Sequence, residues 1–183
     1  MRCLDNKIEA NTVNNDESST DGSNLLHENY LKLNKIAEGL LKDRYSYMIL
    51  KAPGFMDLVI EKIWNNRISL SHYYEQNGDL MSDPDVELIV DKEKETLKAA
   101  TFQQDNLGIY QEAYQGDTLV DDYLANELNN FVSQWLNNIS MQGHIPYKAY
   151  YAEGVMGDQY EVDFDDKGNE IVPEIEDDEE MEM

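Results

Sequence analysis

The chain is short of cysteine, histidine and apolar runs, and each shortage argues against a class of function. Cys3 is the only cysteine among 183 residues, so no intramolecular disulfide and no cysteine-based zinc site can form. Histidine occurs three times, and the sequence has neither a P-loop nor a Gly-x-Gly-x-x-Gly motif. No stretch has the apolar length of a signal peptide or a membrane span. We therefore expect a cytoplasmic protein that is not an enzyme and needs no cofactor or metal.

Basic residues are also scarce, and the result is a large negative charge. The chain has 38 Asp and Glu against 14 Lys and Arg, a net charge of −24. Such a chain repels nucleic acid and anionic membranes, and it is attracted to the cationic grooves in which other proteins hold DNA or RNA. The densest basic run, Lys92 to Lys98, alternates with glutamates and predicts a solvated hairpin tip. We therefore expect no direct binding of nucleic acid.

The composition divides the chain into three parts. Residues 1–23 are rich in Asn, Asp and Ser and predict a disordered leader, because they have little apolar surface to bury. Residues 24–157 predict a single α+β domain. Residues 158–183 contain 13 acids and one base, and they predict an acidic C-terminal tail.

Hydrophobic periodicity predicts two amphipathic helices around an antiparallel sheet. Residues 24–42 repeat apolar side chains at three- and four-residue steps, and a broader apolar stripe runs from about Leu119 to Ile139, with Asp121 and Asp122 in the first turn. Between the helices, short alternating segments separated by turn residues predict a meander of five or six strands. Residues 77–79 and 82–85 are predicted breaks in this meander, and residues 144–157 an irregular segment or edge strand.

Two groups of aspartates are the candidate partner-binding residues. The first group occupies the predicted turns of the meander, and the second alternates with apolar residues, as in a strand added to a sheet edge. The two groups are Asp79, Asp83 and Asp85, and Asp163, Asp165 and Asp166.

The first group has an alternative interpretation as a metal site. His72 and the three aspartates lie close in the sequence, and imidazole with carboxylate ligands suits a divalent cation. However, turn chemistry accounts for aspartates in these positions, and His72 is on the apolar side of its predicted strand. A metal-dependent enzyme therefore stays an alternative only.

Three segments of the predicted sheet carry a resemblance, namely Pro53–Leu58, Ile68–Asp85 and Gln104–Glu112. They resemble an uncharacterised domain family of phages, plasmids and conjugative elements that includes anti-CRISPR proteins. The resemblance implies an inhibitor that binds a type II CRISPR effector nuclease with its guide RNA, inside the bacterial host, and blocks DNA binding or cleavage. It supplies no catalytic residue. The alternative within this class is an anti-restriction or DNA-mimic accessory protein of a mobile element.

Overall fold

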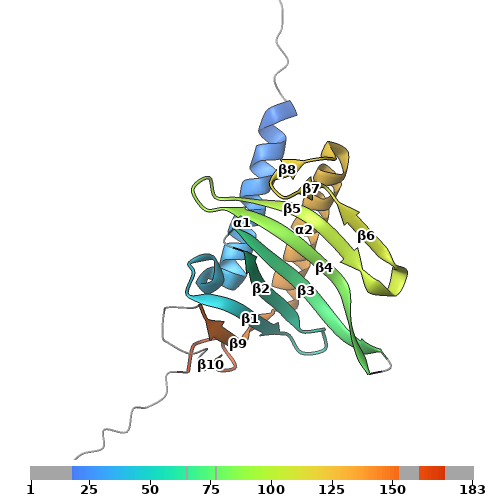
Figure 1. The fold of residues 1–183 in the computed structure, drawn as a ribbon. Helices are drawn as coiled ribbons and strands as arrows, with labels where there is room; N and C mark the ends of the chain where they lie inside the picture. Colours follow the sequence, from blue (N-terminus) through green and yellow to red (C-terminus); the bar gives the residue numbers. More distant parts are fainter. Residues whose placement is uncertain (1–17, 65, 77, 153–160, 172–183) are drawn as a thin grey trace, which may run out of the picture.

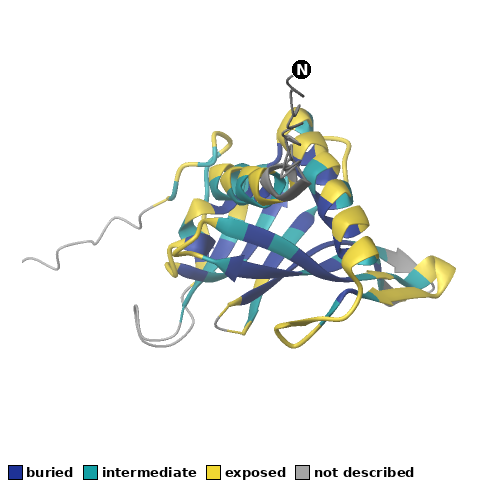
Figure 2. Cartoon of the chain, turned by 90° about the horizontal axis from the view of Figure 1, so that it is seen from above, coloured by how far each residue is buried: buried dark blue, intermediate teal, exposed yellow. Residues whose placement is uncertain are grey.

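Two helices lie on one face of a curved antiparallel sheet (Figures 1 and 2). The computed structural model describes residues 18–64, 66–76, 78–152 and 161–171. The helices are α1, Ser18–Leu41, and α2, Asp122–Gln142. Within the described residues, neither helix combines the length and the apolar character needed to cross a bilayer.

The main sheet has eight strands in the order β10-β9-β1-β2-β3-β4-β5-β6. A two-stranded sheet, β7-β8, follows it in the sequence, and a 3-10 turn, η1, Asp105–Leu107, links β5 to β6. The strands are β1 Tyr45–Lys51, β2 Leu58–Trp64, β3 Arg67–Gln76, β4 Asp79–Asp91, β5 Thr96–Gln104, β6 Ile109–Glu112, β7 Tyr114–Gln115, β8 Thr118–Leu119, β9 Ile145–Tyr151 and β10 Glu161–Asp163.

Both predicted helices are present, and their apolar stripes form the core. In α1, which begins at Ser18 rather than near residue 24, Leu33, Ala37 and Leu40 are fully buried. In α2, Asp121 caps the first turn by accepting a hydrogen bond from the Leu124 amide. Gly143 ends the helix in the left-handed conformation, with φ of 76°, where glycine is favoured.

The sheet is larger than the predicted meander of five or six strands. β1 to β6 do follow one another as an antiparallel meander, but the chain returns after α2 and adds β9 and β10 beside β1. β9 is therefore an inner strand, and Glu161–Asp163, expected in the tail, form the last strand of the sheet. Pairing between β1 and β9 spans about a hundred residues, so local periodicity could not reveal it.

The predicted break at residues 82–85 is wrong, because β4 runs through it. Ser71 and Tyr73 of β3 pair with Asp85 and Ser82, so two residues of β4, Asp83 and Pro84, lie opposite one residue of β3. Proline has no amide hydrogen and is tolerated at such an irregularity in a strand. The Asp83–Pro84 peptide bond is cis.

Candidate functional site: the open face of the sheet

The face of the main sheet opposite the helices is covered by no helix in the part of the chain that the structure describes; we call it the open face (Figures 1 and 2). Successive residues of a strand point to opposite faces. The helix side takes the fully buried Leu50, Leu58, Ile60, Leu70 and Leu88. Their neighbours in sequence therefore belong to the open face.

The strand registers align the open-face residues in two adjacent rows that cross all eight strands. The first row, from β10 to β6, is Glu161, Tyr150, Tyr47, Glu61, Ser69, Glu87, Thr101 and Glu112. The second row is Asp163, Lys148, Ile49, Val59, Ser71, Asp85, Gln103 and Tyr110. Each row has one residue from each strand, and together the rows hold six carboxylates, three tyrosines and one lysine.

Cations neutralise only some of these carboxylates. Arg67 pairs with Glu87 at 2.9 Å and also donates to the backbone oxygen of Gly116, at the turn between β7 and β8. Lys148 pairs with Glu161 and lies 3.9 Å from Asp163. Three carboxylates have no cation within 4 Å among the described residues, and these are Glu61, Asp85 and Glu112.

Burial and the neighbouring negative charges both raise pKa values on the open face. Partial burial raises the pKa of the Asp85 carboxyl, although a hydrogen bond of 2.7 Å from Ser69 Oγ opposes this. The negative charges of Glu87, Asp105 and Glu61 raise that pKa further. Burial and then the charge of Glu112 raise the pKa of Tyr110 in the same way. The face therefore carries a negative potential that the chain itself does not neutralise.

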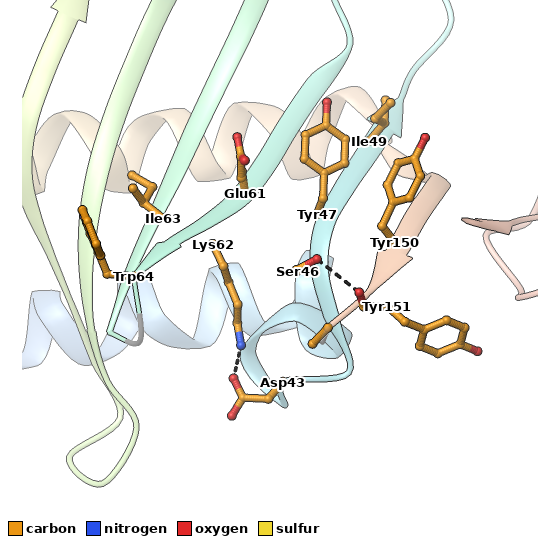
Figure 3. A pocket seen from close by; sticks show the side chains of 11 residues that line it. Asp43, Ser46, Tyr47, Ile49, Glu61, Lys62, Ile63, Trp64, Tyr150 and Tyr151 are labelled. Atoms are coloured by element: carbon orange, nitrogen blue, oxygen red, sulfur yellow. Dashed lines mark hydrogen bonds and ion pairs between the residues drawn. The ribbon is translucent and has the colours of Figure 1, made fainter. Parts of the chain in front are cut away.

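A hollow of about 920 Å³ opens at the β9–β1–β2 end of the open face (Figure 3). Three neighbouring strands each contribute a side chain to its lining: Tyr150 from β9, Tyr47 from β1 and Glu61 from β2. Trp64, which is 70% exposed, lies at the far end of the hollow. A second hollow of about 470 Å³ adjoins it and shares Tyr47, Ile49 and Glu61. Aromatic walls around a free carboxylate suit a cationic ligand.

Of the six aspartates predicted from the sequence, the structure brings two onto the open face. Asp85 and Asp163 lie in the same row, five strand steps apart, which corresponds to about 24 Å. The Asp85 side chain is half-buried, and the Asp163 side chain is exposed. One aspartate of each group therefore lies on the open face. Asp85 reaches it from a strand where a turn was predicted, and Asp163 reaches it from the last strand of the sheet.

The other four aspartates do not join this surface. Asp83 accepts hydrogen bonds from Gln104 Nε2 at 2.6 Å and Asn106 Nδ2 at 2.9 Å, and so ties β4 to η1. Asp165 organises its own turn by accepting from the amides of Lys167 and Asn169. Asp166 is exposed beside it. Asp79 begins β4, and its side chain lies outside the described part of the structure.

His72 and Asp85, two residues of the alternative metal site, lie on opposite faces of the sheet and do not come together. His72 is buried on the helix side, where its Nδ1 lies 2.9 Å from the Asp57 backbone oxygen and its Nε2 accepts from Trp135 Nε1 at 3.3 Å. Burial lowers the pKa of His72. Asp85 lies on the opposite face of the sheet. No metal-binding group of three His, Cys, Asp or Glu occurs among the described residues.

Sequence reasoning missed the glutamates of the open face and two of its tyrosines, Tyr47 and Tyr150. Glu61, Glu87 and Glu112 lie inside strands, whereas the prediction searched turns and tail. Strand alternation around Leu58 and Ile60 places Val59 and Glu61 away from the core, so this signal was available. The alignment of these residues with Tyr150 of β9 could not be predicted from the sequence, because it depends on the register between distant strands.

Comparison with known proteins gives a family but no function. A family model described as a domain of unknown function (DUF6908) matches residues 28–145, which span α1 to the first residue of β9. No curated protein and no solved structure matches the chain.

Proposed function

The chain belongs to the DUF6908 family, and from the charge of its open face we propose that it is a non-catalytic inhibitor of a nucleic-acid-handling enzyme. The target we propose is a type II CRISPR effector nuclease loaded with its guide RNA, which the resemblance of the sheet segments suggests. The chain would act in the cytoplasm of a bacterial host as an anti-CRISPR-type inhibitor. It would bind protein rather than nucleic acid and would use no cofactor.

One observation carries this proposal: an uncovered sheet face holds carboxylates that lack cations. Among the described residues, Glu61, Asp85 and Glu112 have no cation within 4 Å. The same surface also carries Glu87, Glu161 and Asp163. An effector of this class holds its heteroduplex in a positively charged channel and reads a short duplex motif with arginines. A rigid acidic face that occupies either site would exclude target DNA.

The sheet makes this face well suited to binding. The backbone that carries these carboxylates is fixed by strand pairing, so no backbone ordering is needed when a partner binds. Unneutralised charge also speeds association with a cationic surface and makes it sensitive to salt. The proposal therefore predicts fast, salt-dependent binding to the effector.

A guided-cleavage assay with varied order of addition tests the function. The chain is added to the guide-loaded effector before or after target DNA, and cleavage is followed at low and high salt. We expect strong inhibition when the chain is added first and weaker inhibition after DNA has bound. Unchanged cleavage across several type II effectors would contradict the proposal. Capture of a restriction enzyme from host lysate, with no effector, would favour the anti-restriction alternative.

A further inference from the structure

Two tyrosine pairs join β1 to β9, and among the described residues one pair holds a cation and the other does not. Tyr45 and Tyr151 have ring centroids 5.5 Å apart, and Tyr47 and Tyr150 have centroids 5.6 Å apart. The pairs are neighbours along the same two strands. Their surroundings differ in charge, and that difference suggests a ligand.

The first pair, with Arg44 and Glu170, forms a filled site. The Arg44 guanidinium carbon lies 5.3 Å from the Tyr45 ring centroid and 5.8 Å from that of Tyr151. Arg44 forms an ion pair with Glu170, and both tyrosine hydroxyls donate to the same carboxylate, at 2.9 and 2.8 Å. Two tyrosine rings and one glutamate thus hold one arginine.

A second cation of the chain is held by the same chemistry. Lys51 Nζ lies 4.2 Å from the Tyr147 ring centroid and 3.1 Å from Asp57 Oδ2. Both examples combine a tyrosine ring with a carboxylate, which is the arrangement that favours a cation over a neutral group.

The second tyrosine pair has the rings and a carboxylate, but no cation from the described residues lies over its rings or pairs with Glu61. Glu61 pairs with Tyr47 in the strand register, and both line the hollow together with Tyr150. The nearest lysine in that hollow, Lys62, forms an ion pair with Asp43 instead. Tyr150 donates to Glu161, whose own charge is paired with Lys148. The Glu61 carboxylate therefore keeps its negative charge, and it lines the hollow beside the rings of Tyr47 and Tyr150.

We propose that Tyr47, Tyr150 and Glu61 form a subsite that takes an arginine side chain of the partner. Arginine fits better than lysine, because its planar guanidinium stacks on an aromatic ring while it donates to a carboxylate in its own plane. This inference rests on the proposed function, which identifies the partner as the effector nuclease. It adds that an arginine side chain anchors that partner to the chain. Aromatic and arginine residues are typical anchors of protein interfaces.

A titration with a small peptide tests the subsite without any nuclease. A blocked Gly-Arg-Gly peptide is added to the ¹⁵N-labelled chain, with a citrulline peptide as the neutral counterpart of the same shape and a lysine peptide as the second cation. The backbone amides of Tyr47 and Glu61 and the indole of exposed Trp64 report on the hollow. The buried Trp135 indole is an internal control. We expect shifts at the hollow with the arginine peptide, weaker shifts with lysine and none with citrulline.

Two substitutions of equal charge change complete the test. Glu61→Gln removes the carboxylate of the subsite, and Glu93→Gln removes an exposed carboxylate at the β4–β5 turn. We expect roughly tenfold weaker peptide binding in Glu61→Gln and no change in Glu93→Gln. Equal affinity of the two variants, equal shifts with arginine and citrulline, or no shift at millimolar peptide would overturn the subsite.

The subsite and the proposed function can fail separately. If the arginine peptide binds at the hollow while guided cleavage is unaffected by the chain, the subsite stands and the proposed function fails. If the chain inhibits cleavage but Glu61→Gln inhibits as well as Glu93→Gln, the proposed function stands and the subsite fails.

Discussion

Tyr47 and Glu61 are direct cross-strand partners on the open face of the sheet, and both line the same hollow. Burial, followed by the charge of Glu61, raises the pKa of the Tyr47 hydroxyl. The hydroxyl therefore stays protonated and able to donate at physiological pH, beside a carboxylate that has no cation.

Asp85→Asn should stabilise the protein at neutral pH. Burial raises the folded-state pKa of Asp85 above its ordinary value of 3.8, so the folded chain binds this proton more tightly than the unfolded chain. Stability therefore falls as pH rises from 3.8 through the raised pKa, and the deficit persists at neutral pH. Urea unfolding at several pH values between acid and neutral should show that the unfolding free energy of the variant increasingly exceeds that of the parent as pH rises. Asp166→Asn is the exposed control, and a parent as stable as Asp85→Asn at every pH would contradict this account.

Glu170→Gln should have the opposite dependence on pH. Partial burial opposes ionisation of Glu170, but hydrogen bonds from Tyr151 and Tyr45 and the charge of Arg44 hold its pKa below the ordinary value of 4.5. The carboxylate thus adds stability that is present above pH 4.5 and is lost as pH falls through the lowered folded-state pKa. We expect the variant to lose about 1 kcal/mol of unfolding free energy at neutral pH. Thermal melts that show the same loss at strongly acid pH would count against it.

Asn129→Ala should destabilise the fold far more than Asn130→Ala. The buried Asn129 Oδ1 accepts from the Ala99 amide at 2.8 Å, where a register shift interrupts the pairing of β5 with β4. Its loss leaves a buried amide without a partner, at a cost of about 1–3 kcal/mol. Asn130 is exposed on the same helix, and its side chain donates to the backbone oxygen of Asn126 one turn earlier, so its replacement should cost less than about 0.5 kcal/mol. Chemical denaturation measures both, and equal costs would refute the role of Asn129.

Asp165→Lys and Asp166→Lys make the same charge change at adjacent positions but should differ in stability. Asp165 accepts from the amides of Lys167 and Asn169, at 2.9 and 2.8 Å, and from Asn169 Nδ2, at 3.0 Å. Asp166 is exposed. We expect Asp165→Lys to lower the unfolding free energy by about 1–2 kcal/mol and Asp166→Lys to leave it unchanged. If calorimetry finds the two variants equally stable, the carboxylate of Asp165 does not organise this turn.

Much of the fold follows from local patterns in the sequence. The apolar stripe of α2 and its end at Gly143 depend on residues close in sequence, so the helix was predictable. It begins at Asp122, three residues after the predicted start near Leu119, because Thr118 and Leu119 form β8 and Asp121 is the cap. The meander from β1 to β6 was equally local, because each strand pairs with the next. β9 and β10 were not, since their place beside β1 depends on contacts between distant segments.

The candidate site was harder to predict for the same reason. Asp85 and Asp163 were identified by charge, but only the registers of six strands place them in one row. Asp83 and Asp165 have the same chemistry and are engaged in local hydrogen bonds instead. Sequence spacing alone does not separate a carboxylate that holds a turn from one that faces a partner.

The central claim is that the cation-free carboxylates of the open face bind the partner. Two triple variants of equal charge change test it most directly. The open-face variant is Glu61→Gln, Asp85→Asn and Glu112→Gln, and the control, with exposed acids elsewhere, is Glu93→Gln, Glu127→Gln and Asp166→Asn. The measurement is the inhibition constant of each for a guide-loaded type II effector. We expect the open-face variant to be at least about tenfold weaker and the control to stay within about twofold of the parent. Equal inhibition by the two folded variants would contradict the account.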